Sequence, residues 1–137
     1  RFAMVDTDGS RIRLQWDVAG GLFFHPDQWG AILRLARAHG WDPAGTEAPP
    51  GWRGRPWAGV YESACEQRVG TEDARQLSLA VSRALDRYRS CKLQHEDLVE
   101  AVKLIVGAPE ANQRIEAFMD TCLQGGFVLI GAVDIQV

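Results

Sequence analysis

Hydrophobic and polar residues alternate at the start of the chain, which is the pattern of a half-buried strand pair. The alternation runs from Phe2 to Trp16 around Asp8-Gly9, a dipeptide favoured in two-residue hairpin turns because both central positions take positive φ. With this turn, Asp6 lies opposite Arg11 on one face. The other face carries only apolar side chains: Ala3, Val5, Ile12, Leu14 and Trp16. The pattern predicts an N-terminal β-hairpin with one buried face.

Four later segments place apolar residues at the three- and four-residue spacing of an amphipathic helix. Thr71 is the expected N-cap of the second of these helices, because its hydroxyl can accept a backbone hydrogen bond. Glycines at positions 40 and 125 end the first and the fourth. The predicted helices cover residues Pro26 to His39, Thr71 to Arg89, Leu98 to Val106 and Pro109 to Gln124.

The longest apolar run, Phe127 to Val133, predicts a buried strand after the last helix. Trp57 to Tyr61 is a further candidate strand, whereas Gly20-Gly21 is interpreted as a turn. Strands and helices are thus largely segregated along the chain. This order predicts an α+β fold, in which a small, mostly antiparallel sheet (N-terminal hairpin, central strand, C-terminal buried strand) carries about four helices on one side.

Size and composition suit one globular domain, residues 1–137. A chain of 137 residues with 46% hydrophobic residues can bury one core. Its 15 basic and 18 acidic residues are mixed along the chain and give a net charge of -3, which argues against binding to nucleic acid or an anionic membrane. No apolar run reaches the roughly 20 residues of a membrane helix. We expect a cytoplasmic protein, and the sequence leaves its oligomeric state open.

Cysteines and histidines do not follow the spacing of a metal or redox site. The three cysteines are odd in number and widely separated: Cys65, Cys91 and Cys122. Cys122 belongs to the apolar stripe of the fourth helix and is expected in the core. The histidines, His25, His39 and His95, stand at predicted helix ends and suit capping. We predict no metal and no cofactor, and we interpret the segment from Glu62 to Glu66 as a surface turn.

The segment Val5 to Ser10 reads Val-Asp-Thr-Asp-Gly-Ser and resembles the first motif of haloacid dehalogenase-like phosphatases. The resemblance implies a nucleophilic Asp6, an acid-base Asp8 and a magnesium ion. The lysine and acidic pair that this family carries downstream have no counterpart here beyond Asp134. Because Arg11 to Trp16 alternates like a strand, the hairpin turn explains this segment better.

A loop from Trp41 to Tyr61 is the segment most suited to display side chains. It holds three of the five tryptophans and four of the six prolines, together with four glycines and two arginines. The indoles and guanidinium groups offer stacking, cation-π contacts and bidentate hydrogen bonds to an anion. The candidate binding residues are Trp52, Arg53, Arg55, Trp57 and Tyr61. The structural alternative is that the indoles fold inward as a lid on the core.

Short landmarks distributed over about residues 25 to 130 resemble those of small uncharacterised bacterial proteins. They are Gly40 to Thr46, Trp57 to Tyr61, Val69 to Ala74, and the stretch from Phe118 to Gly125-Gly126-Phe127. The resemblance implies a bacterial single-domain protein and no particular activity.

Two main functional hypotheses follow, and a mainly structural or oligomeric subunit is a third possibility. The first is a non-enzymatic binding or protein-interaction domain that uses the Trp/Arg-rich loop to hold a protein partner or a small anionic or aromatic ligand. The alternative is a small hydrolytic enzyme with a carboxylate or histidine acid/base near that loop.

Overall fold

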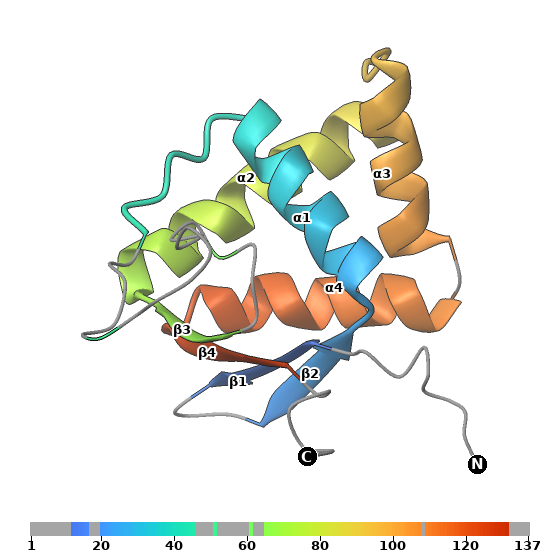
Figure 1. Ribbon diagram of the computed structural model, residues 1–137. Helices are drawn as coiled ribbons and strands as arrows, with labels where there is room; N and C mark the ends of the chain where they lie inside the picture. Colours follow the sequence, from blue (N-terminus) through green and yellow to red (C-terminus); the bar gives the residue numbers. More distant parts are fainter. Residues whose placement is uncertain are drawn as a thin grey trace.

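The computed structural model describes residues 12–16, 20–45, 51, 61, 65–107 and 109–131. In these residues four helices lie on one face of a four-stranded antiparallel sheet, which confirms the predicted α+β class (Figure 1). The elements in chain order are β1 (Ile12–Trp16), β2 (Gly21–Phe24), α1 (Pro26–Ala38), β3 (Cys65–Val69), α2 (Thr71–Arg89), α3 (Glu96–Val106), α4 (Pro109–Cys122) and β4 (Phe127–Gly131).

β1 lies inside the sheet, whose strand order is β2-β1-β4-β3. Ile12 pairs with Phe24 of β2 on one side and with Gly131 of β4 on the other, so both hydrogen-bonding edges of β1 are occupied. This pairing differs from the predicted hairpin around Asp8-Gly9, whose first strand and turn lie outside the described residues. The predicted buried face of this segment is confirmed at Ile12, Leu14 and Trp16.

Two strands were not expected from the pattern. Gly21, interpreted as part of a turn, begins β2 and pairs with Gln15. β3 covers Cys65–Val69, where we predicted a surface turn, and that prediction is wrong for Cys65 and Glu66. The candidate strand Trp57 to Tyr61 is described only at Tyr61, which lies in a turn at a φ of 72°. The centre of β3 is the polar but buried Gln67, so its sequence lacks the usual alternation.

The four predicted helices are confirmed in position, with one correction at the start of α2. The N-cap is Gly70 rather than Thr71, which is the first helical residue. β3 ends at Val69, so the chain passes from strand to helix within one residue. A Cβ on Gly126 would overlap the backbone oxygen of Val69. The turn before β4 therefore packs directly against this junction and requires a residue without a side chain.

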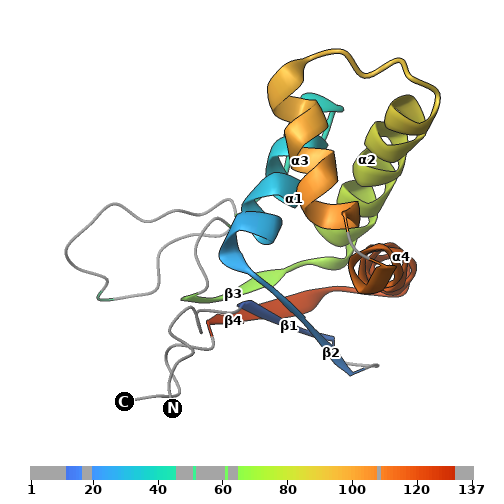
Figure 2. The ribbon, with the colours of Figure 1, turned by 90° about the vertical axis from the view of Figure 1, so that its right-hand side faces the viewer.

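The part of the core that faces the sheet is an aromatic cluster formed by the sheet, α1 and α4. Figure 2 shows α4 end-on over the strands, with the other three helices farther from the sheet. The ring of Phe118 lies at the centre, with ring centroids 5.8 to 6.3 Å from four others: Trp16, Phe24, Trp29 and Phe127. Cys122, one turn farther along α4, is buried as predicted, and burial raises the pKa of its thiol.

Candidate functional site

The first turn of α2 holds both described ends of the Trp41 to Tyr61 loop. One carboxylate oxygen of Asp73 accepts a 2.6 Å hydrogen bond from the Tyr61 hydroxyl. The same carboxylate accepts hydrogen bonds from the backbone N–H groups of Ala44, at 3.0 Å, and Gly45, at 3.2 Å. The backbone carbonyl of Asp73 accepts from the indole N–H of Trp41 at 3.0 Å. We call these five residues the Asp73 clamp.

The two aromatic residues of the Asp73 clamp point inward. Trp41 is 4% exposed and Tyr61 is 1% exposed, and their ring centroids lie 6.0 Å apart. The backbone of Tyr61 is also fixed, because its carbonyl accepts a 2.8 Å hydrogen bond from the indole N–H of Trp29. Burial, together with the hydrogen bond to Asp73 and its charge, raises the pKa of Tyr61. In this structure Tyr61 is thus enclosed, whereas the prediction had it displayed. Trp52, Arg53, Arg55 and Trp57 lie outside the described residues.

A groove of about 420 Å³ runs beside α1. It follows one stripe of the helix from Pro26 to Arg37, a length of about 16 Å at 1.5 Å per residue. We call it the α1 groove, and its described lining residues are Ile12 of β1 and, on α1, Pro26, Trp29, Gly30, Leu33, Arg34 and Arg37. Among these described residues, only the two arginines are polar.

Arg34 and Arg37 give the α1 groove a positive rim. Both side chains are exposed, and in the part of the chain that the structure describes neither has a hydrogen bond or an ion pair. Sequence reasoning missed these residues because arginines on the polar side of an amphipathic helix are ordinary. The only signal was a pair of arginines three apart, beside an apolar stripe and after a helical glycine.

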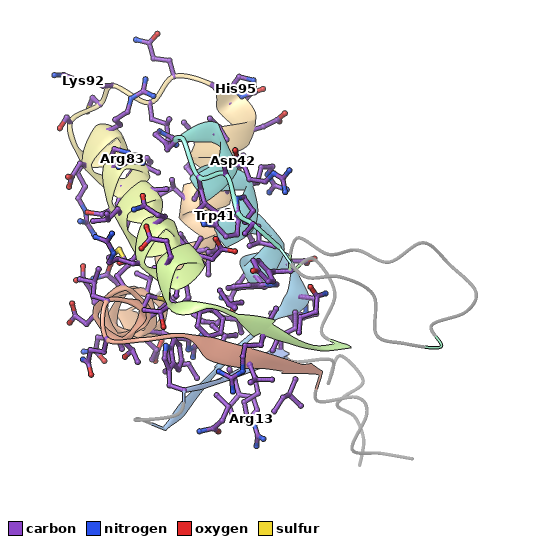
Figure 3. All side chains as sticks on the ribbon, turned by 90° about the vertical axis from the view of Figure 1, so that its left-hand side faces the viewer. Arg13, Trp41, Asp42, Arg83, Lys92 and His95 are labelled. Atoms are coloured by element: carbon purple, nitrogen blue, oxygen red, sulfur yellow. The ribbon has the colours of Figure 1, made fainter. Side chains whose placement is uncertain are left out.

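The histidines occupy three separate helix ends. His25 caps α1 by accepting a 3.2 Å hydrogen bond from the backbone N–H of Asp27. His39 ends the same helix, with its Nδ1 2.9 Å from the carbonyl oxygen of Leu35. His95 precedes α3, at the end of the helical layer far from the sheet face from which Arg13 extends (Figure 3). Among the described residues, no three His, Cys, Asp or Glu side chains are grouped to hold a metal ion.

In the described part of the chain, no helix is long and apolar enough to cross a membrane. Asp6 and Asp8, the two carboxylates of the phosphatase-like segment, lie outside the described residues. Comparisons with protein-family models, with curated proteins and with solved structures found no match for this chain. The resemblance to small uncharacterised bacterial proteins therefore stays a prediction.

Proposed function

We propose that this chain is a non-enzymatic binding domain that holds a small anionic ligand in the α1 groove. The observation that carries the proposal is the pair of guanidinium groups, Arg34 and Arg37, on the rim of an apolar groove. Ligand sites typically combine an apolar lining with a few polar groups that fix orientation. The planar fork of a guanidinium matches the two oxygens of a carboxylate or phosphate.

Apolar contact and charge make different contributions to ligand binding in the α1 groove. Ion pairs between exposed groups contribute only about 0–1 kcal/mol, because water and salt screen them. Arg34 and Arg37 are exposed, so they select an anion and orient it. Most of the affinity has to come from apolar surface buried on the groove, at about 25 cal/mol per Å². The ligand that fits therefore has an apolar body as well as a negative head.

Trp29 connects the α1 groove with the predicted binding loop. Trp29 is one of the residues next to the groove, although it is only 1% exposed, and its indole N–H donates a hydrogen bond to the carbonyl of Tyr61 at the end of the loop. This shared residue supports a single binding region that includes the loop. Trp52, Arg53, Arg55 and Trp57 remain the predicted loop contacts, and Trp52→Ala with Arg55→Ala tests them in the same titration as the groove variants.

The hydrolytic alternative needs a histidine or aspartate paired with a second titratable group in a cavity. His25 is on an exposed helix cap and does not line the α1 groove. The hydrogen bonds described for His39 go to a backbone carbonyl and an arginine, not to a carboxylate. His25 Nδ1 lies 3.7 Å from a carboxylate oxygen of Asp27, but both side chains are exposed and neither residue lines the groove, so the described residues support binding better than hydrolysis.

The test is a titration of the protein with 2-naphthoate, which has a flat apolar body and one carboxylate. Binding is monitored by ¹⁵N–¹H NMR. The double variant Arg34→Ala/Arg37→Ala should weaken binding at least about fivefold, or about 1 kcal/mol. The control Arg75→Ala/Arg89→Ala removes the same charge from α2, where both arginines have exposed acidic partners. It should change the affinity less than twofold. Equal losses in the two double variants, or no shift of groove signals in the wild type, would refute the proposal.

A further inference from the structure

We infer that the ligand of the α1 groove is an elongated anion with a single head, such as a linear alkyl carboxylate, and that Gly30 provides the room for its tail. The inference rests on the proposed function and adds the shape and direction of the ligand. The head lies against Arg34 and Arg37, and the tail runs along α1 toward Pro26.

The direction of the ligand follows from the polarity of the groove. Both arginines belong to the C-terminal half of the stripe along α1. The described lining residues at the other end are apolar: Pro26 opens the helix, and Ile12 lies near it because Ile12 pairs with Phe24, two residues before Pro26. A ligand with charge at one end and hydrocarbon at the other matches this arrangement, whereas a ligand charged at both ends would place one charge on the apolar end.

Gly30 lies among the lining residues of the groove, inside the helix. Glycine inside a helix is less stable than alanine, because it loses more backbone freedom on folding. Packing does not explain it here, since a Cβ at Gly30 would meet no atom within 4 Å. The contrast is Gly126, where a Cβ would overlap backbone atoms. Because Gly30 also lines the groove, a side chain at this position would extend into the space that a ligand tail would occupy.

Position 30 lies midway along the stripe, one turn after Pro26 and one turn before Arg34. A larger side chain there divides the groove into an apolar part and a cationic part. Gly30→Leu should therefore exclude a long tail and leave the head site accessible. The substitution replaces a poor helix former with a good one at a position with open space, so we expect this variant to fold.

The experiment compares butanoate with decanoate, below its micelle-forming concentration, on wild type and Gly30→Leu by NMR titration. The wild type should bind decanoate at least about tenfold more tightly, because each buried methylene adds to the affinity. Gly30→Leu should weaken decanoate at least about fivefold and butanoate less than twofold. A parallel titration with decyl phosphate compares the two anionic head groups. The head group of the compound that binds the wild type more tightly is the one that the groove prefers.

Three outcomes overturn the inference. One is decanoate binding no tighter than butanoate, and another is an equal effect of Gly30→Leu on both. The third is decyltrimethylammonium binding as tightly as decanoate, which would make the groove an apolar contact surface without selection for an anion. If 2-naphthoate still binds through Arg34 and Arg37 in these cases, the proposed function stands and only the elongated ligand is wrong. If neither 2-naphthoate nor decanoate binds the wild type, the proposed function fails.

Discussion

Replacing Asp73 by alanine should release both ends of the Trp41 to Tyr61 loop from α2. The carboxylate accepts hydrogen bonds from the Tyr61 hydroxyl and from the backbone N–H groups of Ala44 and Gly45. The bond from the Trp41 indole goes to the backbone carbonyl of Asp73 and is retained in the variant. The substitution therefore removes the acceptor of three of the four donor groups of the Asp73 clamp and keeps the acceptor of the Trp41 indole.

The loss of unfolding free energy depends on whether each donor can form a hydrogen bond with water once the carboxylate is absent. Tyr61 is buried, so its hydroxyl loses its acceptor without gaining water, at a cost of about 1–3 kcal/mol. Ala44 is exposed and Gly45 is half-buried, and both can bind water, so together they add about 1 kcal/mol. The total loss of unfolding free energy should be about 2–4 kcal/mol, beyond any effect of removing an acid from the start of a helix.

The control is Glu72→Ala, which removes an acid from the same helical turn. Glu72 is exposed, and among the described residues its carboxylate accepts hydrogen bonds from Arg75 and Gln76 of its own helix, so its loss should cost much less stability than the loss of Asp73. Both variants lose the favourable interaction with the helix dipole, which cancels in the comparison. Urea unfolding followed by circular dichroism gives the free energies, and hydrogen exchange reports on the amides of Ala44 and Gly45. If Asp73→Ala and Glu72→Ala agree within about 0.5 kcal/mol, the clamp contributes nothing measurable.

Further predictions concern the core, one turn and the alkaline limit of stability. Phe118→Ala should lower the unfolding free energy by about 3–5 kcal/mol in the same urea assay, because it empties the centre of the aromatic cluster; a loss below about 1 kcal/mol would contradict this role. Gly126→Ala should cost about 1–3 kcal/mol through its overlap with the backbone of Val69, whereas Gly125→Ala, with open space around its Cβ, should stay within about 0.5 kcal/mol. The folded-state pKa of Tyr61 is raised above its unfolded value of 10.0, so its contribution to stability is complete below pH 10 and declines as the pH rises above it. Tyr61→Phe should reduce this alkaline loss in thermal melts at high pH, and an unchanged pH profile would count against the raised pKa of this hydroxyl, which burial and Asp73 cause.

The helices were predictable because each carries local signals. Pro26 and Pro109 mark helix starts, and glycines after α1 and α3 mark their ends. The missed strands lack such signals. The sequence of β3, Cys-Glu-Gln-Arg-Val, has apolar residues only at its ends, and it becomes a strand because β4 supplies a partner. Strand formation at β3 is therefore a tertiary effect, which single-sequence periodicity does not contain.

In the candidate site, too, the locally determined features were predictable and the long-range contacts were not. The composition of the Trp41 to Tyr61 loop shows that its side chains are unusual, but their direction depends on Asp73, which is 32 residues from Trp41 and 12 from Tyr61. Likewise, Arg34 and Arg37 look like ordinary solvated residues until the fold brings Ile12 beside α1. Contacts between residues this far apart in the sequence leave no periodic pattern, so local residue spacing does not predict them.

The place of β4 in the sheet sets an order of assembly during synthesis. β4 lies between β1 and β3, so the N-terminal strand pair and β3 have no shared ladder until residues 127–131 leave the ribosome. Until then one edge of β1 and the facing edge of β3 remain unpaired, and unpaired edges are where strands of different chains join. A chain released before its last strand would therefore present two such edges, and aggregation of truncated products would begin there.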